Sequence, residues 1–225
     1  QSGVNHGLAI LATLSVLTLV LPNYTTSSAG PFYTDNQLIF IAFDALILYG
    51  VFVVAQTIWH RDHFLYPDKD EAPHETVPTA KAIAAAAMLP LALIAVVLLA
   101  KALSPSIEAG VAAMGAPPAM VGIIIAALVL APESLAALSA ARANRVQTSL
   151  NLAIGSALAT IGLTIPAVAI AAMAMGLDLE LGLSAKSTVL LGLTLLVATM
   201  TLSTGRTTMV QGMVHLVIFA SYLFT

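Results

Sequence analysis

The sequence predicts an all-α membrane protein with seven transmembrane helices. Hydrophobic residues make up 59% of its 225 positions, and charged residues make up only 8%. Soluble domains carry about 25% charged residues, so this chain cannot cover a globular surface that faces water. Helices are expected throughout, because an open strand edge in lipid leaves backbone groups unpaired. The net charge of −3 argues against a nucleic-acid partner, and the lack of cysteine excludes disulfides and thiolate metal sites.

Seven apolar segments approach or reach the roughly 20 residues that one bilayer crossing needs. Proline and glycine residues separate most of them, among them Pro22, Pro105, Gly176 and Gly205. We therefore expect membrane-spanning helices over these ranges: Gly7–Leu21, Leu38–Trp59, Ala82–Ala100, Pro118–Ala141, Gln147–Met175, Thr188–Ser203 and Met209–Phe224.

Lysine and arginine residues predict how these helices cross the membrane. Six of the eight lie after the second, fourth and sixth spans, whereas Lys101 and Lys186 lie on the other side. The positive-inside rule places the richer side in the cytoplasm. We therefore expect an integral membrane protein whose C-terminus lies on the outer side. The six residues are Arg61, Lys69, Lys81, Arg142, Arg145 and Arg206.

Residues 60–81 are predicted to form a cytoplasmic linker, which contains five acidic residues and three of the five histidines. A solvated segment broken by prolines is the simpler interpretation. The alternative is a segment that attracts Ca²⁺ or senses pH, because carboxylates suit hard cations and histidine titrates near neutral pH. The residues concerned are Asp62, Asp68, Asp70, Glu71, Glu75, His60, His63 and His74.

Two acidic residues, Asp44 and Glu133, lie inside the predicted spans, and no other does. A charge at the centre of a membrane helix costs at least about 2.5 kcal/mol, so such a residue marks a pathway or a paired site. Glu133 follows Pro132, which has no N–H to donate and crowds the carbonyl of Leu128. We therefore expect the helix to kink or break there. The freed carbonyls and the Glu133 carboxylate are predicted to hold a hard cation or a proton.

The next span offers polar side chains for the same site. Ser156, Thr160 and Thr164 are spaced by four residues and share one helix face, and Asn151 lies near the start of the helix. The structural alternative is that these hydroxyls only bond the carbonyl four residues earlier. We expect Asn151, Ser156 and Thr160 to take part in cation and proton binding.

Asp44 and His215 are candidates for steps in a proton path. For Asp44, the alternative is a carboxylate that pairs with a tyrosine or lies in an open vestibule. For His215, the alternative is a buried imidazole bonded to a neighbour, which is a common arrangement for histidine.

Two stretches resemble the second α-repeat of the cation/Ca²⁺ exchangers: Gly122–Leu138, which contains Leu130-Ala131-Pro132-Glu133-Ser134, and Asn144–Pro166, which contains Gly155-Ser156. More narrowly, the chain is similar to bacterial calcium/proton antiporters, which move Ca²⁺, and in some cases Na⁺ or K⁺, against protons. The similarity extends through Ser203–Arg206 and Gly212–Leu216 to the C-terminus.

The resemblance implies two inverted five-helix repeats, each with one ion-binding acid on a broken helix. Residues 82–225 are then the second repeat, residues 1–59 are the last two helices of the first, and Glu133 is the acid. The sequence departs from the pattern of eukaryotic-type members in two places. They often carry Gly-Asn-Ala-Ala before the acid, where this chain has Leu130-Ala131-Pro132, and a glutamine where this chain has Ala159. The acid-bearing part of the first repeat is expected N-terminal to Gln1. We therefore expect the 225 residues alone neither to bind Ca²⁺ tightly nor to transport it.

Two other classes are weaker alternatives. The first is a seven-helix membrane receptor or a light-driven protein. A retinal-binding protein of this kind needs a lysine in mid-helix, but all four lysines lie near span ends or in loops. An intramembrane hydrolase would have to use Ser134 and His215, and no oxyanion motif accompanies them. The sequence therefore predicts a non-enzymatic exchanger of Ca²⁺, with Na⁺ and K⁺ as alternatives, for H⁺. We expect it to work in a bacterial inner membrane, with its C-terminus in the periplasm, and with no cofactor besides the transported ion.

Overall fold

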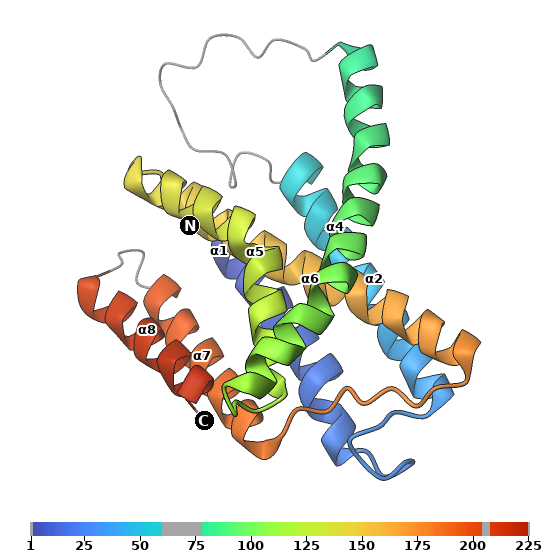
Figure 1. Cartoon of the computed structure of the whole chain (residues 1–225). Coiled ribbons are helices and arrows are strands. Elements are labelled where there is room, and N and C mark those ends of the chain that lie inside the picture. Colours follow the sequence, from blue (N-terminus) through green and yellow to red (C-terminus); the bar gives the residue numbers. More distant parts are fainter. Residues whose placement is uncertain (1, 60–77, 204–207, 225) are drawn as a thin grey trace. The chain divides into compact units, whose positions relative to one another are not determined.

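The computed structural model describes residues 2–59, 78–203 and 208–224, which form helices joined by short connections (Figure 1). Most of the expected linker at 60–81 lies outside the described residues. Two of the helices continue into a π-helix, and the first of them also into a 3-10 helix. In chain order, the helices are α1 (Ser2–Ser15, extended by Val16–Val20 and Leu21–Tyr24), α2 (Asp35–Val54, extended by Ala55–Trp59), α4 (Thr79–Ala113), α5 (Ala119–Arg142), α6 (Val146–Met175), α7 (Ala185–Ser203) and α8 (Met209–Phe224).

Six helical segments among the described residues are long and apolar enough to cross a membrane. The seventh expected span corresponds to α8, which is apolar but only 16 residues long. The prediction of an all-helical membrane protein is confirmed. The six segments are Val4–Tyr24, Asp35–Trp59, Ile94–Ala113, Ala119–Arg142, Val146–Met175 and Ala185–Ser203.

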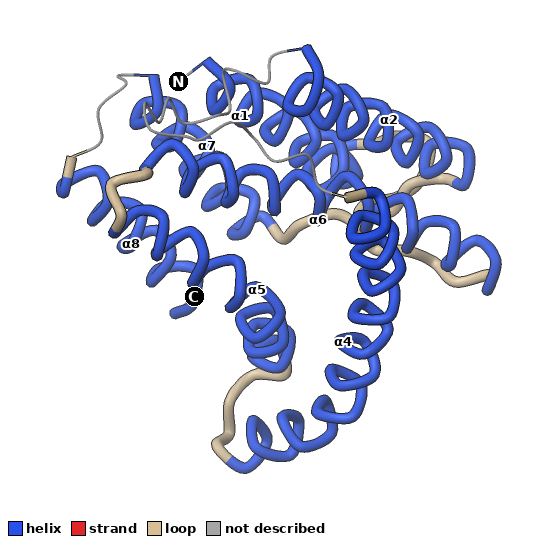
Figure 2. The backbone as a smooth tube through the Cα atoms, turned by 90° about the horizontal axis from the view of Figure 1, so that it is seen from above, coloured by secondary structure: helices blue, strands red, loops and turns tan. Residues whose placement is uncertain are grey.

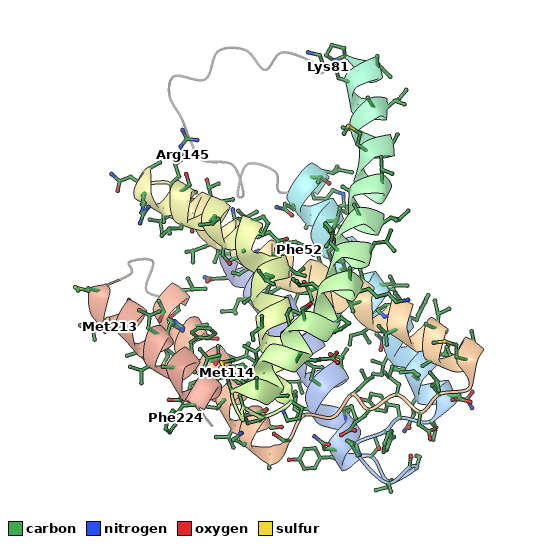
Figure 3. The ribbon with its side chains drawn as sticks, viewed as in Figure 1. Phe52, Lys81, Met114, Arg145, Met213 and Phe224 are labelled. Atoms are coloured by element: carbon green, nitrogen blue, oxygen red, sulfur yellow. The ribbon has the colours of Figure 1, made fainter. Side chains whose placement is uncertain are left out.

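α4 differs from the span expected at 82–100. It is a single helix of 35 residues that continues through Pro105, where the sequence predicted a break; Lys81 near its start and Met114 just after its end are labelled in Figure 3. A proline removes one backbone donor, but the hydrogen bonds on either side persist, because lipid offers no other partner for them. The apolar part of α4 includes Glu108. The expectation that only two acids lie inside spans is therefore wrong.

Side-chain caps and one left-handed glycine explain several helix ends. At the start of α2, the Thr34 hydroxyl accepts from the Gln37 N–H, and the Gln37 side chain accepts from the Thr34 N–H at 3.0 Å. Thr208 and Gln211 make the same reciprocal pair before α8. α6 ends at Gly176, whose φ of 63° lets the chain close the last turn.

Contacts divide the chain into two compact units. The first unit combines Gln1–Tyr66 with Ala137–Thr225 and contains α1, α2, α6, α7 and α8; the second is Pro67–Ala136, with α4 and most of α5. The division into residues 1–59, 60–81 and 82–225 follows an expected repeat rather than contacts, and it stays a prediction.

In the first unit, α6 packs against both α1 and α2 (Figure 2). Phe52 of α2, labelled in Figure 3, is buried in the core of this unit together with Leu158 of α6. Glycine lets the helices approach closely, because a Cβ at Gly162 of α6 would lie 2.7 Å from the Cβ of Tyr49 of α2. Lipid chains are as apolar as leucine, so such tight packing is what holds membrane helices together.

The loops at one end of the first unit are joined by hydrogen bonds. The Asn23 side chain donates to the Leu183 carbonyl at 2.6 Å, and the Leu183 N–H donates to the Leu19 carbonyl at 2.8 Å. The Tyr33 hydroxyl donates to the carbonyl of Leu17 in the π-helix. Burial raises the pKa of Tyr33 to about 12, because the phenolate is poorly solvated there. These bonds fix the segment before α7 against the end of α1.

Gly162→Ala is expected to lower the midpoint of thermal unfolding in detergent. The new methyl group would overlap Tyr49, and overpacking of this kind costs typically about 1–3 kcal/mol. Gly192→Ala in α7 is the matched control, because a Cβ there meets nothing within 4 Å. Equal midpoints for the two variants would contradict the close approach of α6 and α2.

Tyr33 is expected to make stability depend on pH only in alkali. An unfolded tyrosine ionises near pH 10, whereas the pKa of folded Tyr33 is about 12, so folding favours the neutral phenol. The free energy of unfolding should be insensitive to this group below pH 10 and should fall as the pH rises from about 10 to 12.

Denaturant unfolding of Tyr33→Phe should show a smaller fall across that range. Tyr24→Phe, which removes a phenol that is 71% exposed, serves as the control. A fall in the Tyr33→Phe protein as large as that of the wild type would refute the assignment.

Candidate cation-binding site

Glu133 lies within α5, a helix that is long and apolar enough to span a membrane. The only other charge on this helix is Arg142, which lies in its last turn. At 1.5 Å per residue, the two side chains are about 14 Å apart along the helix axis, too far to pair. Glu133 is exposed and has no counter-charge on its own helix. It is therefore available to an external cation or a proton.

Of the kink or break expected at Pro132, the break is wrong, because α5 runs without interruption from Ala119 to Arg142, and the kink stays a prediction. Pro132 cannot donate to the carbonyl of Leu128, but the surrounding turns keep their bonds, since a break would expose several polar groups to lipid. Of the carbonyl groups that a break would free, only that of Leu128, about one turn before Glu133, therefore lacks its helical donor. α6 contains Pro166 and is continuous in the same way.

The polar residues of α6 lie where the sequence placed them. Ser156, Thr160 and Thr164 follow one another turn by turn, with Asn151 half-buried one turn earlier. The Thr160 hydroxyl donates to the Ser156 carbonyl at 2.9 Å. Its proton is thus engaged within the helix, as the structural alternative proposed, while its oxygen keeps lone pairs that can accept from water or bind a cation.

The structure places the predicted ligands in two different units. Asn151, Ser156 and Thr160 belong to the first unit, whereas Pro132 and Glu133 belong to the second. Their assembly into one site stays a prediction. In the part of the chain that the structure describes, no group of three or more His, Cys, Asp or Glu side chains could hold a metal ion.

The two residues expected in a proton path have different surroundings. Asp44 is half-buried in α2, inside the candidate span Asp35–Trp59. His215 of α8 lies with its Nε2 atom 3.5 Å from the Oγ1 atom of Thr201, which is only 6% exposed. The sequence does not single out Thr201, because no local pattern connects residues that lie on two different helices.

Glu108 of α4 was also missed. Its carboxylate accepts a hydrogen bond from the Ser104 hydroxyl at 2.8 Å, one helical turn earlier. The spacing of Ser104 and Glu108 is the i, i+4 spacing of helix neighbours, so the pair was visible in the sequence. The expected break at Pro105 placed it outside a helix.

Comparisons with known proteins identify the family. The family described as "Sodium/calcium exchanger protein" matches residues 84–225. A protein of Sinorhizobium fredii named as an ionic transporter, y4hA, is 48% identical over 223 residues, which are 99% of this chain and 61% of that protein. The sodium-potassium/proton antiporter ChaA of Escherichia coli K12 is 36% identical over 99% of this chain and 62% of its own length. No solved structure matches.

The fold and these matches define an integral membrane protein with several spans, from a class of ion transporters rather than enzymes. The chain belongs to the sodium/calcium exchanger family. It spans about three fifths of the length of the curated relatives it matches.

Pro132→Ala is expected to raise the midpoint of thermal unfolding in detergent. The new N–H would bond the Leu128 carbonyl, and a proline inside a helix costs about 3 kcal/mol. Pro105→Ala, which restores a donor in α4, should raise the midpoint in the same way. An unchanged midpoint in Pro132→Ala would show that the Leu128 carbonyl already has another partner.

Proposed function

We propose that the protein is a secondary transporter that exchanges Ca²⁺ for H⁺ across a bacterial inner membrane by alternating access. The observation that carries this proposal is Glu133, a carboxylate inside a candidate membrane span with no opposite charge within reach on its helix. An unpaired charge in that position costs at least about 2.5 kcal/mol. In a family of ion exchangers, the expected reason for keeping it is that it binds the transported ion.

The coupling of cation transport to proton transport follows from the chemistry of the Glu133 carboxylate. A cation and a proton compete for the same oxygens of Glu133, so the site holds one or the other. If only the occupied forms expose the site to the opposite side of the membrane, each cation carried one way requires a proton to return. Exchange then needs no covalent step.

The remaining ligands are oxygen atoms from two helices. The Leu128 carbonyl lies one turn before Glu133, and Asn151, Ser156 and Thr160 offer amide and hydroxyl oxygens on α6. Residues 82–225 act, in this proposal, as one five-helix repeat, with residues 1–59 as the last helices of another. The C-terminus lies in the periplasm, as the distribution of lysine and arginine indicates.

A second candidate is exchange of Na⁺ or K⁺ for H⁺. One relative is named as a sodium-potassium/proton antiporter. A single carboxylate balances a monovalent ion, whereas Ca²⁺ takes six to eight oxygen ligands and usually more than one carboxylate. An uptake experiment in vesicles distinguishes Ca²⁺ exchange from Na⁺ or K⁺ exchange, because each ion can be supplied alone.

Glu133→Gln is expected to abolish proton-driven uptake. The whole protein is reconstituted into vesicles, a pH gradient is imposed, and uptake of Ca²⁺, Na⁺ and Rb⁺ (as a substitute for K⁺) is measured with radioactive tracers. Glutamine keeps the shape of the side chain but can neither balance a cation nor take up a proton. Uptake should fall to that of protein-free vesicles.

Asp178→Asn is the control, because Asp178 is an exposed carboxylate outside the candidate spans. This variant should transport like the wild type. Proton-driven uptake at the wild-type rate by Glu133→Gln would show that Glu133 is not the coupling residue. Uptake of Na⁺ or Rb⁺ without Ca²⁺ would replace the first candidate by the second.

A further inference from the structure

α7 presents a row of hydroxyl side chains to α8. Ser187, Thr194 and Thr201 are seven residues apart and therefore lie on one face of the helix. α8 packs beside α7 (Figure 1), and its residues His215 and Tyr222 repeat the same spacing. All five belong to the first unit, so their arrangement does not depend on where the second unit lies.

Two cavities follow this row. One, of about 320 Å³, is lined by Ser187, Thr194, His215 and Tyr222 together with apolar residues. The other, of about 470 Å³, is lined by Thr194, Thr201 and His215, and by Thr208 at the start of α8. Each is several times larger than the ~30 Å³ that one water molecule occupies. Thr194 and His215 line both cavities, so this pair marks the boundary between them.

His215 is the group at this boundary that can carry a proton. Its Nε2 atom lies 3.5 Å from the Thr201 hydroxyl, at the long limit of a hydrogen bond. The residues that α1 and α6 contribute to the larger cavity are apolar, among them Leu8, Leu11 and Ile154. Among the described residues that line either cavity, Tyr222 is the only other ionisable group. No charged side chain therefore competes with His215 for a proton there.

The Thr194 hydroxyl is suited to hold water beside His215. It donates to the Leu190 carbonyl at 2.7 Å, which leaves its oxygen lone pairs as acceptors on the cavity side. A threonine whose proton is bonded inside the helix can accept from a water molecule without leaving a buried donor unpaired.

We propose that a hydrated proton path runs along α7 and α8, in which His215 passes protons between the two cavities, separate from the cation ligands around Glu133. A hydronium ion in one cavity gives its proton to the unprotonated ring nitrogen of His215. The imidazolium then releases the proton of its other nitrogen to water in the second cavity. One proton moves, the imidazole is neutral again, and a rotation of the ring, which exchanges the positions of its two nitrogens, resets it. The path rests on the proposed function, for which it supplies or removes the exchanged proton.

His215→Gln tests the path when two transport modes of the whole protein are compared in vesicles. Proton-driven uptake of Ca²⁺ and Na⁺ requires the path, whereas exchange of labelled for unlabelled cation without a pH gradient requires only the cation site. We expect proton-driven uptake to fall about 100-fold, the order of magnitude that one proton-transfer group contributes. Cation self-exchange should stay at the wild-type rate. His6→Gln, which changes an exposed histidine of α1 outside both cavities, should affect neither mode.

A second pair of variants keeps the test decisive if His215→Gln folds poorly. Thr194→Val should slow proton-driven uptake about fivefold, the effect of one lost hydrogen bond. Thr199→Val is its matched control, because Thr199 makes the same bond to its own helix, with Leu195, but is exposed and lines neither cavity.

The outcomes separate this path from the function on which it rests. Equal losses of both modes in His215→Gln, or no loss in either, would overturn the path, and so would equal rates for the two threonine variants. Glu133→Gln should lose both modes. A wild-type protein without either mode would overturn the proposed function, and the path with it.

Discussion

Backbone hydrogen bonding in the absence of water is the constraint on which the rest of this structure depends. A carbonyl or N–H group that faces lipid has no partner outside the protein, so each helix must satisfy its own. α4 and α5 therefore continue through Pro105 and Pro132 rather than breaking. The same constraint explains why threonine hydroxyls such as those of Thr160 and Thr194 donate to the carbonyl four residues earlier.

Among the described residues, some polar side chains are not satisfied by the backbone of their own helix. Glu133 and Glu108 are carboxylates on candidate spans, and His215 lies between two cavities. Close helix packing excludes water elsewhere in the first unit, because Gly162 lets α6 approach Tyr49 of α2 too closely for a water molecule to fit between them. The first unit thus combines a dry contact of α6 with α2 and a wider space along α7 and α8.

The helical membrane class and the candidate acid Glu133 could be predicted from the sequence, because composition and a charge inside an apolar run do not depend on tertiary structure. The break at Pro132 was predicted wrongly. Proline removes one helical hydrogen bond, but a break would leave several backbone groups without partners in lipid, and that larger cost was not considered. The contact of Thr201 with His215 joins two helices, so it follows from packing rather than from a local pattern. The spacing of Thr194 and Thr201 on α7 was visible in the sequence, but only the structure shows that these residues line cavities.

Charge balance connects the two proposed sites. A single carboxylate releases one proton for each cation that it binds, so exchange of Ca²⁺ through Glu133 alone would move one net positive charge per cycle. Moving an elementary charge against 100 mV costs about 2.3 kcal/mol, which makes such a cycle strongly dependent on the membrane potential. Exchange of Na⁺ or K⁺ for one proton is electroneutral, and the path through His215 then carries only the proton that Glu133 exchanges. A second proton that crosses through His215 for each Ca²⁺ would balance the charge of a divalent ion.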